Sequence, residues 1–378
     1  MPRAIDCDMI DPAADQLVIC LGPGGVGKTT VSAAIALQAA IAGRAVDIMT
    51  VDPAPRLLDA LGLKEHPASP HEVPLNGLNA RSRARLRALR LDPKRMFDLL
   101  IERYAPSAAA RHAILSDRIY RSLSQALAGV ADYMAMEQLL QLRQEGTADL
   151  IVLDTPPAHE ALDFLDAPRR MIELLSSRAL TLLGASRDRI RGRLSILDLA
   201  ARAVLAAFDR LTGLHLLADI QAFTRSFDGM YTGFAERAGA AQQLLGAAST
   251  RIVLVTTAEP QRVEQTAEFV APLAGLNLEI RALVVNRVMP PLPEPGELER
   301  AELPASLKRK LLRNLGDYSA LKSREAAWLQ RLRELMPQGT AIFVAPDLGH
   351  EPRTLRHLVR IARSIRPATK EASGEPQP

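Results

Sequence analysis

Short runs of consecutive apolar residues recur along the chain, and segments with helical spacing of apolar positions separate them. The runs cover residues 17–21, 45–51, 149–154, 251–256, 280–286 and 340–345. Unbroken apolar runs of this length are typical of strands buried on both faces, as in a parallel sheet between two layers of helices. The alternation of strands and helices predicts an α/β fold with a doubly wound, mostly parallel sheet.

Two long stretches interrupt this alternation. Residues 92–148 and 158–250 have apolar positions at helical spacing and few signals for strands. Both are too long to be ordinary crossovers, so we expect them to fold together as a helical subdomain inserted into the core. The other predicted parts are an N-terminal extension (1–16), the core (17–91, 149–157 and 251–366) and a disordered tail (367–378).

The glycine-rich segment after the first strand fits the phosphate-loop pattern GxxxxGK[ST]. Its backbone N–H groups are expected to surround the phosphates, Lys28 to reach the β and γ oxygens, and Thr29 to ligate Mg²⁺. A flexible connector with an accidental lysine is disfavoured, because a predicted strand (17–21) and helix (29–42) flank the loop. The residues expected to bind a nucleoside triphosphate are Gly22, Gly24, Gly25, Val26, Gly27, Lys28, Thr29 and Thr30.

Two aspartates follow predicted strands. Asp154 ends the run 149–154 and Asp52 follows the run 45–51. Ligands bind at the carboxyl edge of open parallel sheets, so both carboxylates should face the phosphate loop. Asp154 is placed to hold Mg²⁺ through water, and Asp52 to orient or deprotonate an attacking water. Each could instead cap the helix predicted after it, and in Asp154 capping would not exclude the metal role.

Asn286 ends the run 280–286 and offers the paired donor and acceptor that an adenine edge requires. Asparagine at a strand end is more often part of a turn, so its position alone leaves both interpretations open.

Composition limits the possible ligands. Apolar residues make up 48% of the chain but aromatic residues only 4%, which suits an aliphatic core between helices and sheet. The two cysteines, Cys7 and Cys20, allow neither a disulfide framework nor a four-cysteine zinc site.

The charge of +4 is small for this length, and the basic run 81–90 lacks interleaved aromatic residues. We interpret that run as a solvated face rather than a lipid or nucleic-acid surface, and we do not expect nucleic-acid binding.

No stretch approaches the roughly 20 uninterrupted apolar residues of a membrane-spanning helix. The N-terminus carries several aspartates and lacks the basic start and apolar run of a signal peptide. A cytoplasmic location is therefore expected.

Four motifs together resemble those of the ArsA-like ATPases, in particular bacterial ArsA-related proteins. That family includes the arsenite-pump ATPase and the ATPases that target tail-anchored membrane proteins. The motifs are Gly24–Thr30, Asp52–Ala54, Asp154–Pro157 and Val284–Val288, and the similarity runs from about residue 17 to residue 361. The resemblance implies a slow Mg-dependent ATPase built on a P-loop core with an inserted helical subdomain.

The resemblance also implies roles by position. Lys28 and Thr29 would hold phosphate and Mg²⁺, Asp52 would activate water, and Asp154 would begin the second switch segment. At the other end of the nucleotide, Asn286 would contact adenine with Arg287 beside it, and the loop at Pro346 would pack near the base. Such ATPases act as nucleotide-gated dimers whose helical subdomains rearrange on ATP binding.

The chain departs from the family pattern at position 23. The signature lysine, which reaches across the dimer to the partner's nucleotide, is replaced by Pro23. A substitute cation could come from Arg56, from Arg287 or from a partner that keeps the lysine. The cysteines that bind arsenite or dimer-seam zinc in some members have no counterpart, so neither is expected to bind.

Three functional interpretations follow. The first is a cytoplasmic Mg-ATPase, paired with itself or with a related ATPase, whose helical subdomain engages a protein client, with membrane proteins among the candidates. Met134, Met136, Met171 and Met230 would suit a client groove but are more often core. The second is a low-turnover regulatory subunit that pairs with a lysine-bearing paralogue, which Pro23 motivates. The third is a partition-type ATPase acting on DNA or membranes.

Overall fold

The computed structural model describes residues 10–11, 14–78, 80–81, 83–117, 120, 128–156, 158–176, 230–349, 352 and 354–368. The predictions for the N-terminal extension and the C-terminal tail, and for the helical stretch between 177 and 229, lie wholly or mostly outside these residues.

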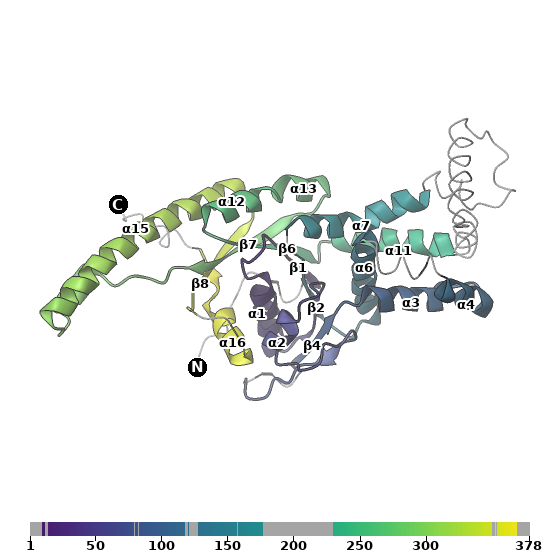
Figure 1. The fold of residues 1–378 in the computed structure, drawn as a ribbon, viewed down its shortest axis with the longest axis horizontal. Coiled ribbons are helices and arrows are strands. Elements are labelled where there is room, and N and C mark those ends of the chain that lie inside the picture. The colour runs from purple at the N-terminus through teal and green to yellow at the C-terminus, as the bar shows by residue number, and fades with distance from the viewer. Residues whose placement is uncertain are drawn as a thin grey trace, which may run out of the picture. The chain divides into compact units, whose positions relative to one another are not determined.

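The described strands form one sheet in the order β3-β4-β2-β5-β1-β6-β7-β8-β9 (Figure 1). The strands are β1 (Leu17–Leu21), β2 (Ala45–Thr50), β3 (His71–Glu72), β4 (Arg85–Arg90), β5 (Leu150–Asp154), β6 (Thr250–Thr257), β7 (Ile280–Val288), β8 (Ala341–Pro346) and β9 (Arg366–Pro367). All pairings are parallel except those of the short edge strands β3 and β9. The predicted α/β class with a doubly wound, mostly parallel sheet is confirmed.

Helices cover both faces of this sheet. They are α1 (Lys28–Ile41), α2 (Arg56–Ala60), α12 (Pro260–Ala267), α13 (Val270–Gly275), α15 (Ala305–Leu335) and α16 (Leu355–Ser364), and the short α14 (Pro295–Arg300) packs against α15. Figure 1 shows α1, α2 and α16 on one face and α12, α13 and α15 on the other. Every residue of β1 and β5 is buried, which explains their unbroken apolar sequences. These two central strands bring their carboxyl ends to the same edge.

The basic run 81–90 is not the solvated face that we predicted from its charge. Most of it forms β4, in which Leu86, Ala88 and Leu89 are buried. Arg87 is paired in register with the fully buried Asp47 of β2 and donates two hydrogen bonds to its carboxylate, at 2.7 and 2.6 Å. The ion pair allows an arginine to lie within the sheet, because each charge offsets the desolvation of the other.

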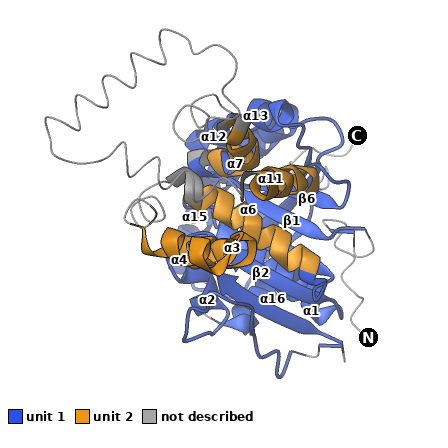
Figure 2. Ribbon diagram, turned by 90° about the vertical axis from the view of Figure 1, so that its right-hand side faces the viewer, with its two compact units in different colours: residues 1–90, 145–162, 246–378 blue, residues 91–144, 163–245 orange. Residues whose placement is uncertain are grey.

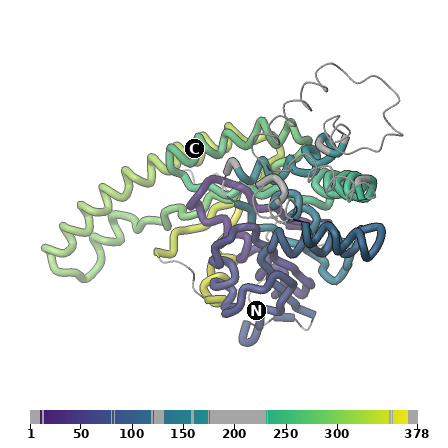
Figure 3. Tube along the Cα trace, turned by 45° about the vertical axis from the view of Figure 1, so that its right-hand side comes forward, coloured from purple at the N-terminus to yellow at the C-terminus, as the bar shows by residue number. Residues whose placement is uncertain are grey.

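The chain divides into two compact units, shown in different colours in Figure 2. Unit 1 comprises residues 1–90, 145–162 and 246–378, and unit 2 comprises residues 91–144 and 163–245. Unit 1 therefore contains both ends of the colour range in Figure 3 and is built from segments far apart in the sequence. The predicted core and helical subdomain divide the chain in a similar way, and their status as separate domains stays a prediction.

Unit 2 is helical in its described part. Its elements are α3 (Pro93–Tyr104), α4 (Ala108–Ser116), α11 (Tyr231–Leu245) and the larger parts of α6 (Ala128–Glu145) and α7 (Ala158–Ser176). Met134 and Met230 are buried in its apolar cluster, and Met171 packs against that cluster half-buried. These methionines are core residues in this structure, so they give no support to a client groove.

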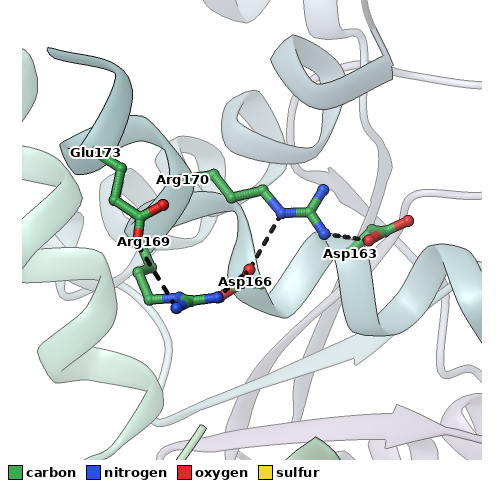
Figure 4. Close-up of polar contacts among 5 residues, drawn as sticks. All are labelled: Asp163, Asp166, Arg169, Arg170 and Glu173. Carbon is green, nitrogen blue, oxygen red and sulfur yellow. Dashed lines mark hydrogen bonds and ion pairs between the residues drawn. The ribbon is translucent and has the colours of Figure 1, made fainter. Parts of the chain in front are cut away.

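A charged network follows one side of α7 around Pro168 (Figure 4). Asp166 accepts hydrogen bonds from Arg169 at 2.6 and 2.9 Å and from Arg170 at 3.1 Å. Arg170 also pairs with Asp163, and Arg169 with Glu173 at 3.6 Å. Because proline cannot donate a main-chain hydrogen bond, these side-chain links span the turn in which the helix lacks one.

Among the described residues, no helix is both long enough and apolar enough to cross a membrane.

Candidate functional site

The phosphate loop connects β1 to α1, and two of its glycines are sterically required. Gly27 precedes α1 with φ 92° and ψ 28°, a left-handed conformation that side chains disfavour. A Cβ on Gly27 would lie 2.3 Å from Nδ2 of Asn286, and one on Gly22 would lie 2.0 Å from the carbonyl oxygen of Val255. The loop is thus pressed against β6 and β7, which accounts for glycine at both positions.

Lys28 begins α1 and is buried, with 7% of its surface exposed. Its Nζ donates hydrogen bonds to the carbonyl oxygens of Gly22 and Pro23, both at 3.0 Å. Burial lowers the pKa of Lys28, while the nearby carboxylates of Asp154 and Asp52 oppose that effect. The ammonium group therefore lies inside the loop, beside the predicted acidic residues.

Asp154 is the centre of the site. Its carboxylate accepts hydrogen bonds from Thr29 at 3.0 Å, Thr50 at 3.1 Å and Ser32 at 3.2 Å. Burial raises the pKa of Asp154 to about 6, against the lowering effects of the hydroxyl donors and of Lys28. A carboxylate and hydroxyl oxygens in a buried cluster are the hard donors that Mg²⁺ prefers, so the residues present fit this ion.

Asp52 lies near Lys28 but in a separate turn. Its backbone N–H donates to the hydroxyl of Thr50 at 3.2 Å, and its carboxylate accepts from the N–H of Ala54 at 2.8 Å. The side chain is half-buried. The helix predicted after Asp52 begins at Arg56, after Pro55, because the carboxylate of Asp52 closes a turn first.

The residues predicted to contact adenine are less closely grouped. Asn286 is buried, and its Nδ2 donates to the carbonyl oxygen of Val26 at 2.9 Å, so it supports the phosphate loop. Arg287 is exposed with φ 57°, and Pro346 of β8 is paired with Val288 of β7. Both lie at the carboxyl edge on β7 and β8, beyond β6 from the loop strand. Their contact with a base stays a prediction.

Three residues of the site escaped the sequence analysis. Ser32 follows Thr29 by one helical turn, and Thr50 is paired in register with Asp154 across β2 and β5. Helical spacing from Thr29 could have indicated Ser32. Thr50 could have been identified only from the shared strand edge, which requires knowledge of the strand order. Arg262 of α12 lies near the loop, with a terminal nitrogen 3.8 Å from where a Cβ on Gly25 would be. No local pattern indicated it.

Comparison with known proteins adds to this geometry. The sequence profile that defines the anion-transporting ATPases matches residues 15–318, which include the loop, both aspartates and Asn286. The ATPase GET3 of Malassezia globosa is 24% identical over 313 residues, covering 83% of this chain and 84% of the relative. The ATPase ASNA1 homolog of Babesia bovis is 24% identical over 295 residues, covering 78% and 72%. An uncharacterized protein of Streptomyces coelicolor is 28% identical over 279 residues, covering 73% and 63%.

Proposed function

This chain belongs to the anion-transporting ATPase family and is an ATP hydrolase, and from that premise we propose that it is a nucleotide-driven switch. In this proposal the phosphate loop of unit 1 binds Mg-ATP, and hydrolysis is coupled to a rearrangement of unit 2. The observation that carries the proposal is the hydrogen-bonded cluster of Thr29, Thr50 and Asp154, which links the loop helix to two strands beside it.

Four side chains of the site have proposed tasks. Lys28 exchanges its carbonyl partners in the loop for phosphate oxygens. The negative phosphate charge then stabilises the charged form of Lys28, which burial disfavours. Thr29 and Asp154 hold Mg²⁺, Asp154 through water, and the ion would neutralise phosphate charge. Asp52 orients or deprotonates the attacking water, since one of its carboxylate oxygens closes the turn at Ala54 and the other accepts no side-chain or turn hydrogen bond among the described residues.

The proposed result of ATP binding is that two chains associate and that unit 2 changes its arrangement. We propose that Mg-ATP brings two copies, or this chain and a related ATPase, together as a dimer, and that unit 2 engages a protein client. The resemblance to ATPases that target tail-anchored membrane proteins makes membrane proteins the first class of client to test. A cytoplasmic location fits that role.

Pro23 favours one alternative, a regulatory subunit with little turnover. This residue is buried and carries no charge, so no lysine at position 23 can reach a partner's nucleotide from this chain. Measured turnover decides between the two functions.

The test compares Lys28→Ala and Asp52→Asn with wild type in Mg-ATP binding and phosphate release. Lys28→Ala should abolish binding, and Asp52→Asn should bind ATP but hydrolyse it about a hundredfold more slowly. Matched controls are Lys94→Ala on α3 and Asp59→Asn on α2, both solvent-accessible. Normal hydrolysis by Asp52→Asn would show that another group activates water, and very low turnover by wild type would favour the regulatory subunit.

A further inference from the structure

Arg262 approaches the phosphate loop from the side opposite Asp154. β1 lies between β5, which carries Asp154, and β6, whose Val255 is in close contact with Gly22. The chain leaves β6 at Thr257 and enters α12 at Pro260, so Arg262 lies in the first turn of the helix next to the loop. A terminal nitrogen of Arg262 comes within 3.8 Å of the position of a Cβ on Gly25, and Gly25 is solvent-exposed.

The guanidinium group of Arg262 is half-buried without a described carboxylate partner. One terminal nitrogen donates to the side-chain oxygen of Gln265 at 2.8 Å. Within the part of the chain that the structure describes, Arg262 forms no ion pair, whereas Arg87 and Arg251 in the same unit each pair with an aspartate. The positive charge of Arg262 also repels that of Lys28, and an anion bound near both groups would offset this repulsion.

The other candidate cations of this chain are less well placed. Arg56 and Arg287 are both exposed, and Arg287 lies near the end of β7, one strand farther from the loop than β6. Pro23 provides no charge. Of these three arginines, Arg262 is the one that the structure shows beside the loop, on a helix that is remote in sequence.

We propose that Arg262 binds a phosphate oxygen of the ATP held by its own chain and so takes the place of the cation missing at position 23. This inference rests on the proposed function of the loop. It differs from the family arrangement because the cation comes from the same chain and not from a partner. Guanidinium groups suit this task, since their planar donors pair with two phosphate oxygens at once.

Calorimetric titration with Mg-ATP and Mg-ADP tests the contact. Arg262→Gln should weaken Mg-ATP binding about tenfold or more, as expected for loss of a charge-assisted hydrogen bond. Arg262→Lys should recover part of the affinity, which a merely structural role of the guanidinium would not predict. The control is Arg281→Gln, an exposed arginine at the opposite, amino end of β7, which should bind as wild type does.

Thermal unfolding without nucleotide separates binding from folding. Arg262→Gln should unfold at the wild-type temperature, because the only described side-chain bond it loses is that to Gln265. If Arg262→Gln binds Mg-ATP as tightly as wild type, the inference is wrong. If wild type itself fails to bind Mg-ATP, the proposed function is wrong, so the two failures are distinguishable.

Mixing two variants tests whether Arg262 acts on its own chain. Lys28→Ala chains have no competent loop but retain Arg262, and Arg262→Gln chains retain the loop. If the arginine served the partner's nucleotide, mixed dimers would regain turnover. We expect the mixture to hydrolyse ATP no faster than Arg262→Gln alone, and recovery of turnover would overturn the assignment to the same chain.

Discussion

The carboxylate of Asp154 accepts hydrogen bonds from three hydroxyl groups, two on α1 and one on a neighbouring strand. Ser32 and Thr29 come from α1, and Thr50 comes from β2. Because a carboxylate is the acceptor in all three bonds, the first turns of α1 are linked to the sheet edge. A site held by such bonds limits the ordering cost of nucleotide binding.

Asp154→Asn should separate metal binding from folding. The amide has the size of the carboxyl group and can donate to the threonine hydroxyls, so the unfolding temperature should change by only a few degrees. The amide is a much weaker Mg²⁺ ligand, so Mg²⁺ should no longer strengthen ATP binding. Titrations with ATP in the presence of Mg²⁺ and of chelator measure this, and a retained Mg²⁺ effect would exclude Asp154 from the metal site.

Gly27→Ala should damage nucleotide binding, whereas Gly62→Ala should not. Both glycines have positive φ, 92° and 79°, so both substitutions should lower the free energy of unfolding by about 1–2 kcal/mol through backbone strain. A Cβ at residue 62 meets no atom within 4 Å, but at residue 27 it meets Asn286 at 2.3 Å. Only Gly27→Ala should therefore weaken Mg-ATP binding. Equal affinities in the two variants would show that the contact with Asn286 is unimportant.

At residue scale, the sequence identified site residues that belong to a contiguous motif or end a predicted strand. Lys28 and Thr29 follow from a contiguous motif, and Asp154 and Asp52 follow from strand ends. Ser32, Thr50 and Arg262 could not be identified in this way, because serine, threonine and arginine are common surface residues. Their importance depends on strand order and register, which a single sequence does not reveal.

Helix α7 contains Pro168, and its charged network provides a prediction about pH. Contacts with Arg169 and Arg170 lower the pKa of Asp166 below its usual value of about 3.9. A carboxyl group with a lowered pKa in the folded state stabilises the protein above the unfolded pKa, and the contribution disappears as pH falls through the folded value. Both arginines are about half exposed, at 55% and 52%, so solvent screening should keep the effect below about 1 kcal/mol.

Asp166→Asn should therefore lower the free energy of unfolding at pH 7 and at pH 5, with the difference from wild type shrinking as pH falls below about 4. Denaturant unfolding across that range measures it. The control is Glu102→Gln, an exposed carboxylate of α3 outside this network. A difference that stays constant down to the acid limit would mean that Asp166 acts through packing and not through charge.

At element scale, strands with two buried faces were predictable and those with mixed faces were not. The six apolar runs match β1, β2, β5, β6, β7 and β8 to within one or two residues at each end. β4 was missed because arginine alternates with its apolar residues, and the pairing of Arg87 with Asp47 that makes this possible is non-local. The edge strands β3 and β9 have two residues each, too few to produce a pattern.

For the whole molecule, the proposed switch requires that ATP binding change the association of two chains. If Arg262 serves the nucleotide of its own chain, association is not needed to complete the positive charge around the phosphates. Association would then transmit the nucleotide state to unit 2 and its client, and turnover per chain should not depend on protein concentration.

The solution mass of Asp52→Asn, measured by light scattering with and without Mg-ATP, tests the switch most directly, because this variant should bind ATP and hydrolyse it only slowly. We expect the mass of one chain without nucleotide and the mass of two chains at saturating Mg-ATP. An unchanged mass, with ATP binding established by calorimetry on the same sample, would contradict a switch that works through association.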